Sequence, residues 1–394
     1  MPIDRNDFEN IGEPDIQELL SGGVPEGLRI EYKREIYGGS DADKKEALKD
    51  ISALANADGG HLVIGVECQN GLPTAVLGIE VPDPDEVILR LEQLARSGIE
   101  PRIIGLRTKA IVLANGRHCF VMRISKSWAA PHRVSAYGSN RYWVRNSSGV
   151  HEASVEELRS MFLAGATALQ RMREFRDERV QYVCSGVGSR PLTGNGRLFI
   201  HIFPFSSFIG NSTVDLREVH QHDQVFRPLG SSGGGSRFNL DGFINERSGE
   251  QNNGYTQVFR NGAIEATKSG IVSNRDSRRL ISGVGTEKQF FEVVPKYIDG
   301  LRTLNIPAPL CLMITLEGVN GAAYAVRSNQ WDDEEPPLSR DKIELPECIV
   351  DEYGDYGSYC RALRPAFDAL WNASGYVEAQ TFNAAGEWIG RSVA

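Results

Sequence analysis

The amino-acid sequence predicts a protein of the α+β class with two domains. The chain has 394 residues, more than the roughly 100 to 200 of a single domain, and 41% of them are hydrophobic and 24% charged. Short segments with strand and helix periodicity follow one another up to a long predicted helix that ends near residue 179, and the pattern changes after it. We therefore expect one domain over residues 1–179 and a second α+β domain over residues 180–394.

In the first domain, apolar residues at helical spacing predict three helices and a longer closing helix, and alternating apolar residues predict a mixed sheet. Ser154 and Glu157 form a capping box at the start of the closing helix. Asn70-Gly71 is a hairpin turn signal. The helices are expected over residues 14–20, 43–56, 83–98 and 154–179, and the strands over residues 28–36, 61–67, 75–79, 102–113, 117–125 and 141–145.

The second domain carries further strand and helix patterns but no motif that indicates its chemistry. The run from Ser231 to Ser236 predicts a loop that is too short to separate two domains. The strands are expected over residues 197–205, 238–244, 255–260, 310–316 and 322–326, and the helices over residues 287–304 and 358–371.

Charge is distributed unevenly along the chain. The formal net charge is −9, from 43 Lys and Arg against 52 Asp and Glu, which by itself argues against nucleic-acid binding. Residues 101–150 nevertheless contain nine basic side chains and no acidic one, so this segment carries +9 and the other 344 residues carry −18 (−9 minus +9). Aromatic residues interleave with the basic ones, which is typical of surfaces that contact phosphates and stack on bases. A solvated basic face on a pair of strands is the alternative. The nine are Arg102, Arg107, Lys109, Arg117, Arg123, Lys126, Arg133, Arg141 and Arg145.

The six cysteines are scattered without a Cys-x-x-Cys pair, which predicts free thiols in a reducing compartment. The first residues lack the pattern of a signal peptide, and no apolar run approaches the roughly 18 residues of a membrane span. We therefore expect a cytoplasmic protein that does not associate with membranes.

Glu26, Glu31 and Lys33 form a candidate site for a divalent cation and a phosphate. Carboxylate oxygens suit hard cations, and an ammonium group neutralises charge on a phosphate. On a regular strand Glu26 and Glu31 would point to opposite faces, so they converge only if Pro25 and Gly27 place Glu26 in a turn. Separate surface carboxylates are the alternative.

The order of these and later motifs resembles the Schlafen AlbA-2 domain over roughly residues 13–165. That family combines strands and helices around a basic groove that holds nucleic acid, so we expect this fold here. The resemblance is carried by Glu31-Tyr32-Lys33-Arg34, by residues 51–66 with Gly59-Gly60 and Gly65-Val66, by Gly78, by Arg141-Tyr142-Trp143-Val144-Arg145, and by residues 153–158.

The resemblance implies nucleic-acid binding and, for nuclease members, metal-dependent cleavage of tRNA or rRNA. Such members bind Mg²⁺ or Mn²⁺ through three carboxylates, and Glu26 and Glu31 match the first two. Cys68 stands at the third position, and the neighbouring Glu67 is the candidate replacement. The expected catalytic residues are Glu26, Glu31, Lys33 and Glu67, with Glu26, Glu31 and Glu67 as metal ligands; the expected nucleic-acid-binding residues are Lys33, Arg34, Arg123, Lys126, Arg133, Arg141, Tyr142 and Arg145.

Two classes of function are open on these residues. The first is an RNA-directed protein, with tRNA as the expected substrate of a divalent-metal-dependent endoribonuclease. The second, which Cys68 favours, is a non-catalytic DNA- or RNA-binding module or a subunit of a prokaryotic antiviral defence or regulatory assembly. The family's groove has two lobes and the motif occurs once in this chain, so we expect a homodimer or a larger homo-oligomer.

Overall fold

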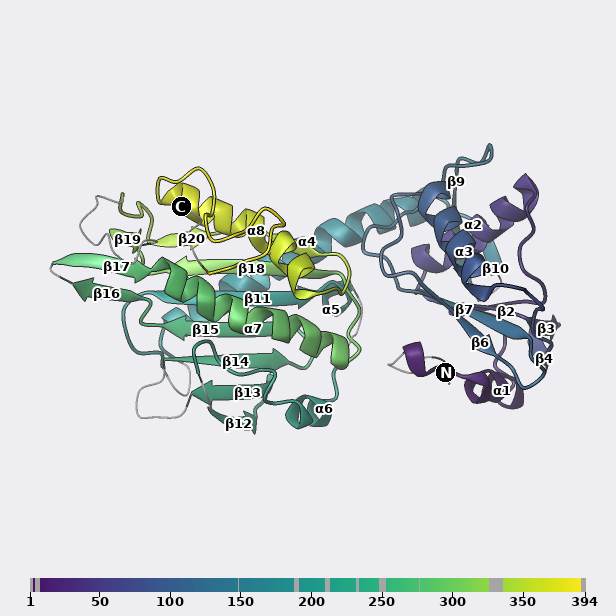
Figure 1. The fold of residues 1–394 in the computed structure, drawn as a ribbon, viewed down its shortest axis with the longest axis horizontal. Coiled ribbons are helices and arrows are strands. Elements are labelled where there is room, and N and C mark those ends of the chain that lie inside the picture. Colours follow the sequence, from purple (N-terminus) through teal and green to yellow (C-terminus); the bar gives the residue numbers. More distant parts are fainter. Residues whose placement is uncertain are drawn as a thin grey trace. The chain divides into compact units, whose positions relative to one another are not determined.

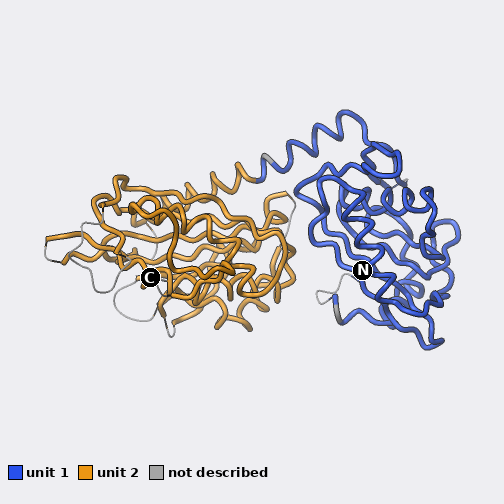
Figure 2. Tube along the Cα trace, turned by 45° about the horizontal axis from the view of Figure 1, so that its top comes forward, with its two compact units in different colours: residues 1–168 blue, residues 169–394 orange. Residues whose placement is uncertain are grey.

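The computed structural model describes residues 3, 8–147, 149–187, 191–209, 213–231, 234–247, 253–275, 277–325 and 336–390. The chain forms two compact units, residues 1–168 and residues 169–394 (Figure 2). The division falls inside α4 (Val155–Cys184), which begins in the first unit and ends in the second. The α+β class predicted from the sequence is confirmed, because each unit combines helices with sheets that contain antiparallel strands.

The first unit is built on a mixed four-stranded sheet with the order β1-β2-β7-β6 (Figure 1). β1 and β2 are parallel, whereas β7 is antiparallel to both of its neighbours. The strands are β1 (Ile30–Lys33), β2 (Gly60–Ile64), β6 (Arg107–Val112) and β7 (His118–Ile124).

Alternating side chains of this sheet enter two separate cores. On one face, Leu62 and Phe120 pack with apolar residues of α2 (Asp41–Asn56) and α3 (Pro84–Gly98). On the other face, Val63 and Val121 pack with α1 (Glu13–Ser21) and with Ile3, Phe8 and Ile11 near the N-terminus. Because each strand residue faces the opposite side from its neighbours, functional side chains of the sheet are also divided between these two faces.

A second sheet with the order β10-β9-β8-β5 flanks α2. The side chain of Asn56 joins the end of α2 to this sheet, donating to the carbonyls of His132 and Trp143 at 2.9 and 2.8 Å and accepting from the His132 amide. Asn56 therefore fixes the position of β9 against α2. The strands are β5 (Ile99–Glu100), β8 (Arg133–Val134), β9 (Arg141–Asn146) and β10 (Gly149–Glu152).

The single strand predicted over residues 61–67 is two strands in the structure. Gly65 has φ of +103°, and a Cβ at this position would lie 3.2 Å from the Cα of Gly78, so only glycine suits the break. The chain leaves the main sheet there and forms a hairpin of β3 (Val66–Gln69) and β4 (Leu72–Val76), joined by the predicted Asn70-Gly71 turn.

The second unit contains a large antiparallel sheet with the order β12-β13-β14-β15-β11-β18-β20, in which β21 also pairs with β18. α7 (Gly283–Thr303) and α8 (Tyr356–Ala373) lie against this sheet (Figure 1), and their apolar residues pack in the core on one of its faces. The final turns of α4 pack on the other face through Val180 and Val183. The strands are β11 (Arg197–Pro204), β12 (Gly234–Phe238), β13 (Gly242–Arg247), β14 (Gly254–Phe259), β15 (Ile264–Ser269), β18 (Leu310–Glu317), β20 (Lys342–Glu344) and β21 (Cys348–Val350).

Smaller elements complete the second unit, and one predicted strand there is divided. The strand predicted over residues 238–244 is the end of β12, a turn at residues 239–241 and the start of β13. A three-stranded sheet has the order β16-β17-β19. The remaining elements are α5 (Ser206–Ile209), α6 (Leu216–Gln221), β16 (Val272–Arg275), β17 (Arg278–Ser282) and β19 (Ala322–Ala325).

Glu265 on β15 is a fully buried carboxylate beneath α4. It accepts two hydrogen bonds from the Arg179 guanidinium at 2.8 and 3.1 Å, one from His201 Nε2 at 3.0 Å and one from the Tyr255 hydroxyl at 2.6 Å. Burial alone would raise the pKa of Glu265, but the hydrogen bonds and charges of His201 and Arg179 outweigh it and lower the pKa to about 2. The ionised carboxylate therefore fastens α4 to the sheet.

Glu287 on α7 is a second fully buried carboxylate, and its four partners are neutral. One oxygen accepts from Trp371 Nε1 at 2.7 Å and from the Tyr324 hydroxyl at 3.0 Å. The other accepts from the Thr381 hydroxyl at 2.6 Å and from Trp388 Nε1 at 2.9 Å. These bonds join α7 to β19, to α8 and to the segment after α8.

All six cysteines are free, and four of them are buried. Within the described ranges, no helix combines the length and apolar character needed to cross a bilayer.

Candidate nucleic-acid interface

A cluster of four charged residues joins β1, α2 and β9 in the first unit. The Lys33 ammonium on β1 lies 2.9 Å from Asp50 Oδ2 on α2 and 3.0 Å from Glu31 Oε1. The other oxygen of Glu31 lies 2.7 Å from Arg145 Nη2 on β9, and the Arg145 side chain is only 2% exposed. The structure thus brings together the predicted residues Glu31, Lys33 and Arg145 and adds Asp50 to them.

The pKa values of two groups in this cluster, Lys33 and Asp50, are both raised. Burial alone would lower the pKa of Lys33, but the charges and hydrogen bonds of Asp50 and Glu31 raise it overall. Burial raises the pKa of Asp50, although Lys33 opposes this, and burial also raises the pKa of Tyr37, whose hydroxyl donates to Asp50 at 2.8 Å. Lys33 therefore stays a cation at neutral pH and is not a proton acceptor there.

Glu26 and Cys68 lie side by side at a short distance from this cluster. Glu26 precedes β1, and its Oε1 accepts the amide of Tyr32 at 3.1 Å. Burial, then the charge and hydrogen bond of Glu26 and the charge of Glu31, raise the pKa of the Cys68 thiol to about 11. Cys68 thus occupies the position next to Glu26 and near Glu31, and it stays a neutral thiol.

Glu67 faces away from Glu26 and Glu31. A bulge separates Glu67 from Cys68 on β3, and Glu67 Oε1 pairs with the exposed Arg34 at 2.9 Å. No group of three or more His, Cys, Asp or Glu side chains able to hold a metal ion occurs in the described part of the chain. The predicted ligands Glu26, Glu31 and Glu67 therefore do not form such a group, and Cys68 brings a neutral thiol instead of a third carboxylate to the neighbourhood of Glu26.

Most basic residues of the 101–150 segment pair with carboxylates from elsewhere in the chain. The distances between the charged atoms range from 2.6 to 3.9 Å, and Arg145 is the most deeply buried member of the set. The acid-free segment is therefore not a continuous unpaired basic surface in three dimensions. The pairs are Arg117 with Glu80, Lys126 with Asp58, Arg133 with Glu100, Arg141 with Glu152 and Arg145 with Glu31.

Arg141 and two lysines of α2 lie beside two half-buried aromatic rings, Tyr137 and Trp143, which also pack against the core around α2. The Arg141 guanidinium lies over the Trp143 ring at 5.9 Å, and the Lys44 ammonium lies over the Tyr137 ring at 5.0 Å. The Lys45 ammonium lies 4.0 Å from where a Cβ would stand on Gly138, in the loop that leads into β9. We call this set the α2–β9 surface: Lys44, Lys45, Tyr137, Arg141 and Trp143.

The sequence reasoning found Arg141 but missed Lys44 and Lys45. Acidic residues lie on both sides of these lysines in α2, so the local net charge does not reveal a basic surface. The sequence feature that could have identified them is their position opposite the apolar stripe of the helix. Lys45 forms no ion pair among the residues that the structure describes. Tyr142 alternates with Arg141 and Trp143 on β9 and is half-buried, so it faces the other side of that strand.

Arg123 lies on the opposite face of the main sheet from the charge cluster. Its Nε donates to His61 Nε2 at 3.0 Å, its Nη2 donates to the carbonyl of Ile3 at 2.7 Å, and its guanidinium lies over the Phe8 ring at 4.9 Å. The predicted nucleic-acid residues are therefore divided between two faces of the first unit.

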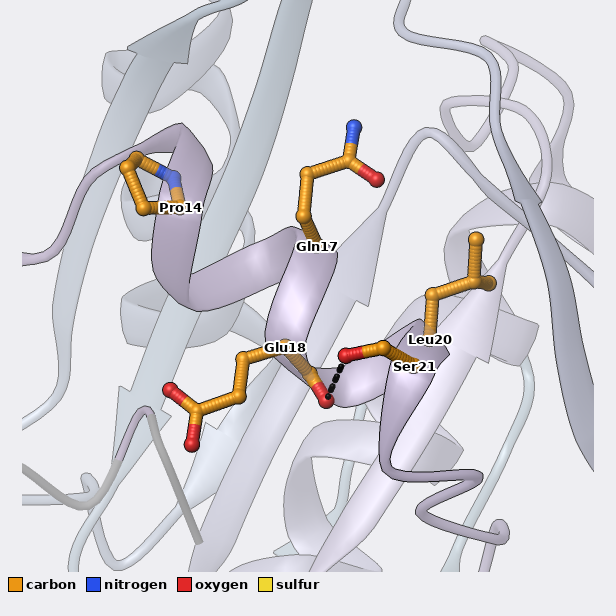
Figure 3. Close-up of a pocket in the computed structure, with 5 residues that line it drawn as sticks. All are labelled: Pro14, Gln17, Glu18, Leu20 and Ser21. Carbon is orange, nitrogen blue, oxygen red and sulfur yellow. Dashed lines mark hydrogen bonds between the residues drawn. The ribbon is translucent and has the colours of Figure 1, made fainter.

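A hollow on the surface of the first unit lies apart from all these residues (Figure 3). The Ser21 hydroxyl donates to the Glu18 carbonyl there at 3.3 Å. All of its lining residues belong to α1 and none is a predicted site residue; they are Pro14, Gln17, Glu18, Leu20 and Ser21.

Comparison with known proteins agrees with the sequence resemblance. Residues 26–154 match the family model described as Schlafen, AlbA_2, which confirms the predicted family for this segment. No curated protein sequence matches the chain.

Solved structures also match parts of the chain, among them two of low overall similarity. The first is the solution structure of the N-terminal domain of a protein from Nitrosomonas europaea described as related to the ATP-dependent DNA helicase RecG; it is 25% identical, with a TM-score of 0.26, over 33% of this chain and 86% of that one. The second is the crystal structure of the DIP2311 protein from Corynebacterium diphtheriae, 14% identical, with a TM-score of 0.25, over 35% of this chain and 29% of that one.

Proposed function

Because residues 26–154 form a Schlafen AlbA_2 domain, we propose that this chain binds nucleic acid, RNA in preference to DNA, and that it does so without cutting the strand. The ligand contacts the α2–β9 surface. The second unit lies outside the family match, and the proposal assigns it no part in binding.

The observation that carries the proposal is the pairing of cations with aromatic rings on the α2–β9 surface. Arg141 over Trp143 and Lys44 over Tyr137 place positive charge beside π faces, which suits a phosphate backbone with unpaired bases. Unpaired bases that stack on aromatic side chains are the usual target of RNA-binding proteins, hence the preference for RNA with tRNA loops as the model ligand.

The cations of this surface can exchange their present partners for phosphate at small cost. Arg141 and Glu152 are both more than half exposed, and exposed ion pairs of this kind contribute only about 0–1 kcal/mol. Lys45 has no acidic partner to lose within the described residues. A phosphate that approaches between these two side chains therefore gains charge pairing without breaking a buried contact.

The charge cluster supports binding without cleavage. General acid–base catalysis needs a group whose pKa lies near the working pH. The pKa values of Lys33 and Cys68 are both raised, so both groups stay protonated at neutral pH, and Asp50, whose pKa burial also raises, is paired with Lys33. Glu31 is neutralised by Lys33 and Arg145 at its two oxygens. The cluster therefore links β1, α2 and β9 and stabilises the geometry of the α2–β9 surface.

Equilibrium binding to a fluorescent tRNA and to RNA and DNA strands of one sequence tests the proposal. The double variant Lys45→Ala/Arg141→Ala should weaken RNA binding about tenfold and reduce the slope of log affinity against log salt by about 1 to 2. Lys288→Ala/Lys296→Ala on α7 is the matched control, because it removes the same charge from exposed positions of the second unit. Equal losses in both variants, or none in the first, would contradict the proposal, and equal affinity for RNA and DNA would remove the RNA preference.

Incubation of the same tRNA with Mg²⁺ or Mn²⁺ tests the absence of cleavage. We expect intact tRNA. Cleavage that disappears in Glu26→Gln/Glu31→Gln would instead support a metal-dependent endoribonuclease in which Glu26, Glu31 and Lys33 act as catalytic residues.

We further propose that the binding form is a homodimer or larger homo-oligomer. The support is the single copy of the motif in a family whose groove has two lobes. Light scattering that gives the mass of one 43.5 kDa chain in the presence of RNA would contradict it.

A further inference from the structure

A row of basic side chains crosses the sheet face opposite the charge cluster. Arg107 on β6 is the direct cross-strand partner of Arg123 on β7, and His61 on β2 is the next partner in the same register. Lys109 stands two residues further along β6, so strand alternation places it on the same face. Like charges directly opposite one another destabilise a sheet unless something compensates them.

The N-terminal segment of the chain lies on this row. The Phe8 ring is stacked by both guanidinium groups, with Arg107 Cζ at 5.0 Å and Arg123 Cζ at 4.9 Å from its centroid. Arg123 also donates to the carbonyl of Ile3 at 2.7 Å, and Lys109 donates to that of Ile11 at 2.9 Å. Each of the three cations therefore contacts the segment.

The segment is held by burial as well as by these polar contacts. Ile3, Phe8 and Ile11 are at most 2% exposed and belong to the core that includes Val63 and Val121. Beyond the segment, Glu13 at the start of α1 accepts the amide of Ala114 at 2.8 Å. Ile3, Phe8 and Ile11 are thus held over this face, and we call these three residues the cover.

The residues that contact this face offer groups that a nucleic-acid strand also offers. The Phe8 ring gives two guanidinium groups a π face, and the carbonyls of Ile3 and Ile11 give Arg123 and Lys109 acceptor oxygens. Bases and phosphates present the same two features, a π face and acceptor oxygens.

We propose that the face formed by Arg107, Lys109 and Arg123 is a second binding surface for a nucleic-acid strand, and that the chain's own N-terminal segment occupies it. The identity of the ligand rests on the proposed function. In the intact chain the cover blocks this face, so nucleic acid binds to the α2–β9 surface. When the cover is loosened, nucleic acid can contact both surfaces.

The full-length variant Phe8→Ala tests this, because it removes the ring that both guanidinium groups contact. We expect RNA affinity to rise about tenfold and the salt dependence to become steeper, as two or three further phosphate contacts require. In the Phe8→Ala background, Arg107→Ala/Arg123→Ala should cancel this gain. Phe8→Leu, which keeps the apolar volume but loses the π face, should give a smaller gain of the same kind and serves if Phe8→Ala does not fold.

The outcomes separate this inference from the proposed function. Wild-type binding that depends on Lys45 and Arg141, together with no gain in either Phe8 variant, overturns the inference alone. A loss of wild-type affinity in Arg107→Ala/Arg123→Ala also overturns it, because the face would then be open already. If wild-type binding does not depend on Lys45 and Arg141, the proposed function is overturned. The second surface would still be supported if Phe8→Ala raised the RNA affinity and Arg107→Ala/Arg123→Ala cancelled that gain.

Discussion

Arg145 and Glu31 form a buried ion pair that joins β9 to β1, with 2.7 Å between Nη2 and Oε2 and only 2% of the Arg145 side chain exposed. Glu31 is an edge-strand residue of the main sheet, whereas Arg145 belongs to the second sheet. The pair therefore bridges two sheets of the first unit. Its partner Lys33 extends the link to Asp50 on α2.

Removing the Arg145 side chain should destabilise the first unit strongly. Arg145→Ala leaves the carboxylate of Glu31 in a mostly buried position with Lys33 alone, and breaking a buried pair costs about 3–5 kcal/mol. Urea unfolding measures the loss. Glu31→Gln/Arg145→Ala is the control: the double variant should lose less than the sum of the two single variants, and strict additivity would show that the pair contributes nothing.

Replacing Cys68 by aspartate should create a divalent-cation site that the wild-type chain lacks. The change sets a third carboxylate beside Glu26 and near Glu31, in place of a thiol whose pKa is about 11. Electron paramagnetic resonance of free Mn²⁺ should show binding by Cys68→Asp with a Kd of roughly 0.1–1 mM, as in weak oxygen-ligand sites. Cys68→Ser, which adds no charge, is the control. Mn²⁺ binding by the wild-type chain, or by neither variant, would contradict this account of the site.

The stability of the second unit should fall in acid because of Glu265. Its pKa is lowered from 4.5 to about 2, so the folded state loses this contribution progressively as the pH falls from about 4.5 to 2, and retains it in full above that range. A shift of this size corresponds to about 3 kcal/mol. Urea unfolding at a series of pH values should show a steeper acid loss for the wild-type chain than for Glu265→Gln. Parallel curves would assign the acid sensitivity to other carboxyl groups.

Glu287 should stabilise the second unit through its four donors. Glu287→Gln keeps the size but turns one acceptor oxygen into an amide donor that faces the donors of two neighbours. Leaving buried donors unsatisfied costs about 1–3 kcal/mol each, so we expect at least that loss. The fluorescence of Trp371 and Trp388, which both donate to Glu287, reports unfolding in urea directly at the site. Unchanged stability would mean that these donors find other partners.

The local sequence pattern was sufficient to predict the family segment and most of the helices and strands. The helix predicted over residues 43–56 is observed as Asp41–Asn56, and the strand predicted over residues 197–205 as Arg197–Pro204. Breaks inside predicted strands were missed where a glycine lies in an apolar run. At Gly65 the apolar pattern continues across the break, and only the positive φ separates β2 from β3.

The distribution of charge on the folded surface could not be predicted from the local sequence, because ion pairs join distant segments. Lys126 meets Asp58 and Arg133 meets Glu100, and neither acid lies within the basic segment of the sequence. The link between Arg123 and the N-terminal segment spans more than a hundred residues and depends on sheet register. The spacing alone left open whether Pro25 and Gly27 place Glu26 in a turn before β1, and in the structure the chain bends at Glu26.

The cysteines of this chain have a consequence for its oxidation chemistry. Burial raises the pKa of all six thiols, from the half-buried Cys68 and Cys184 to the enclosed Cys119, Cys311, Cys348 and Cys360. Peroxides and disulfides react with the thiolate, which is scarce at neutral pH in every one of these sites. Peroxide should therefore oxidise these six thiols slowly in the folded chain, which mass spectrometry after peroxide treatment would measure.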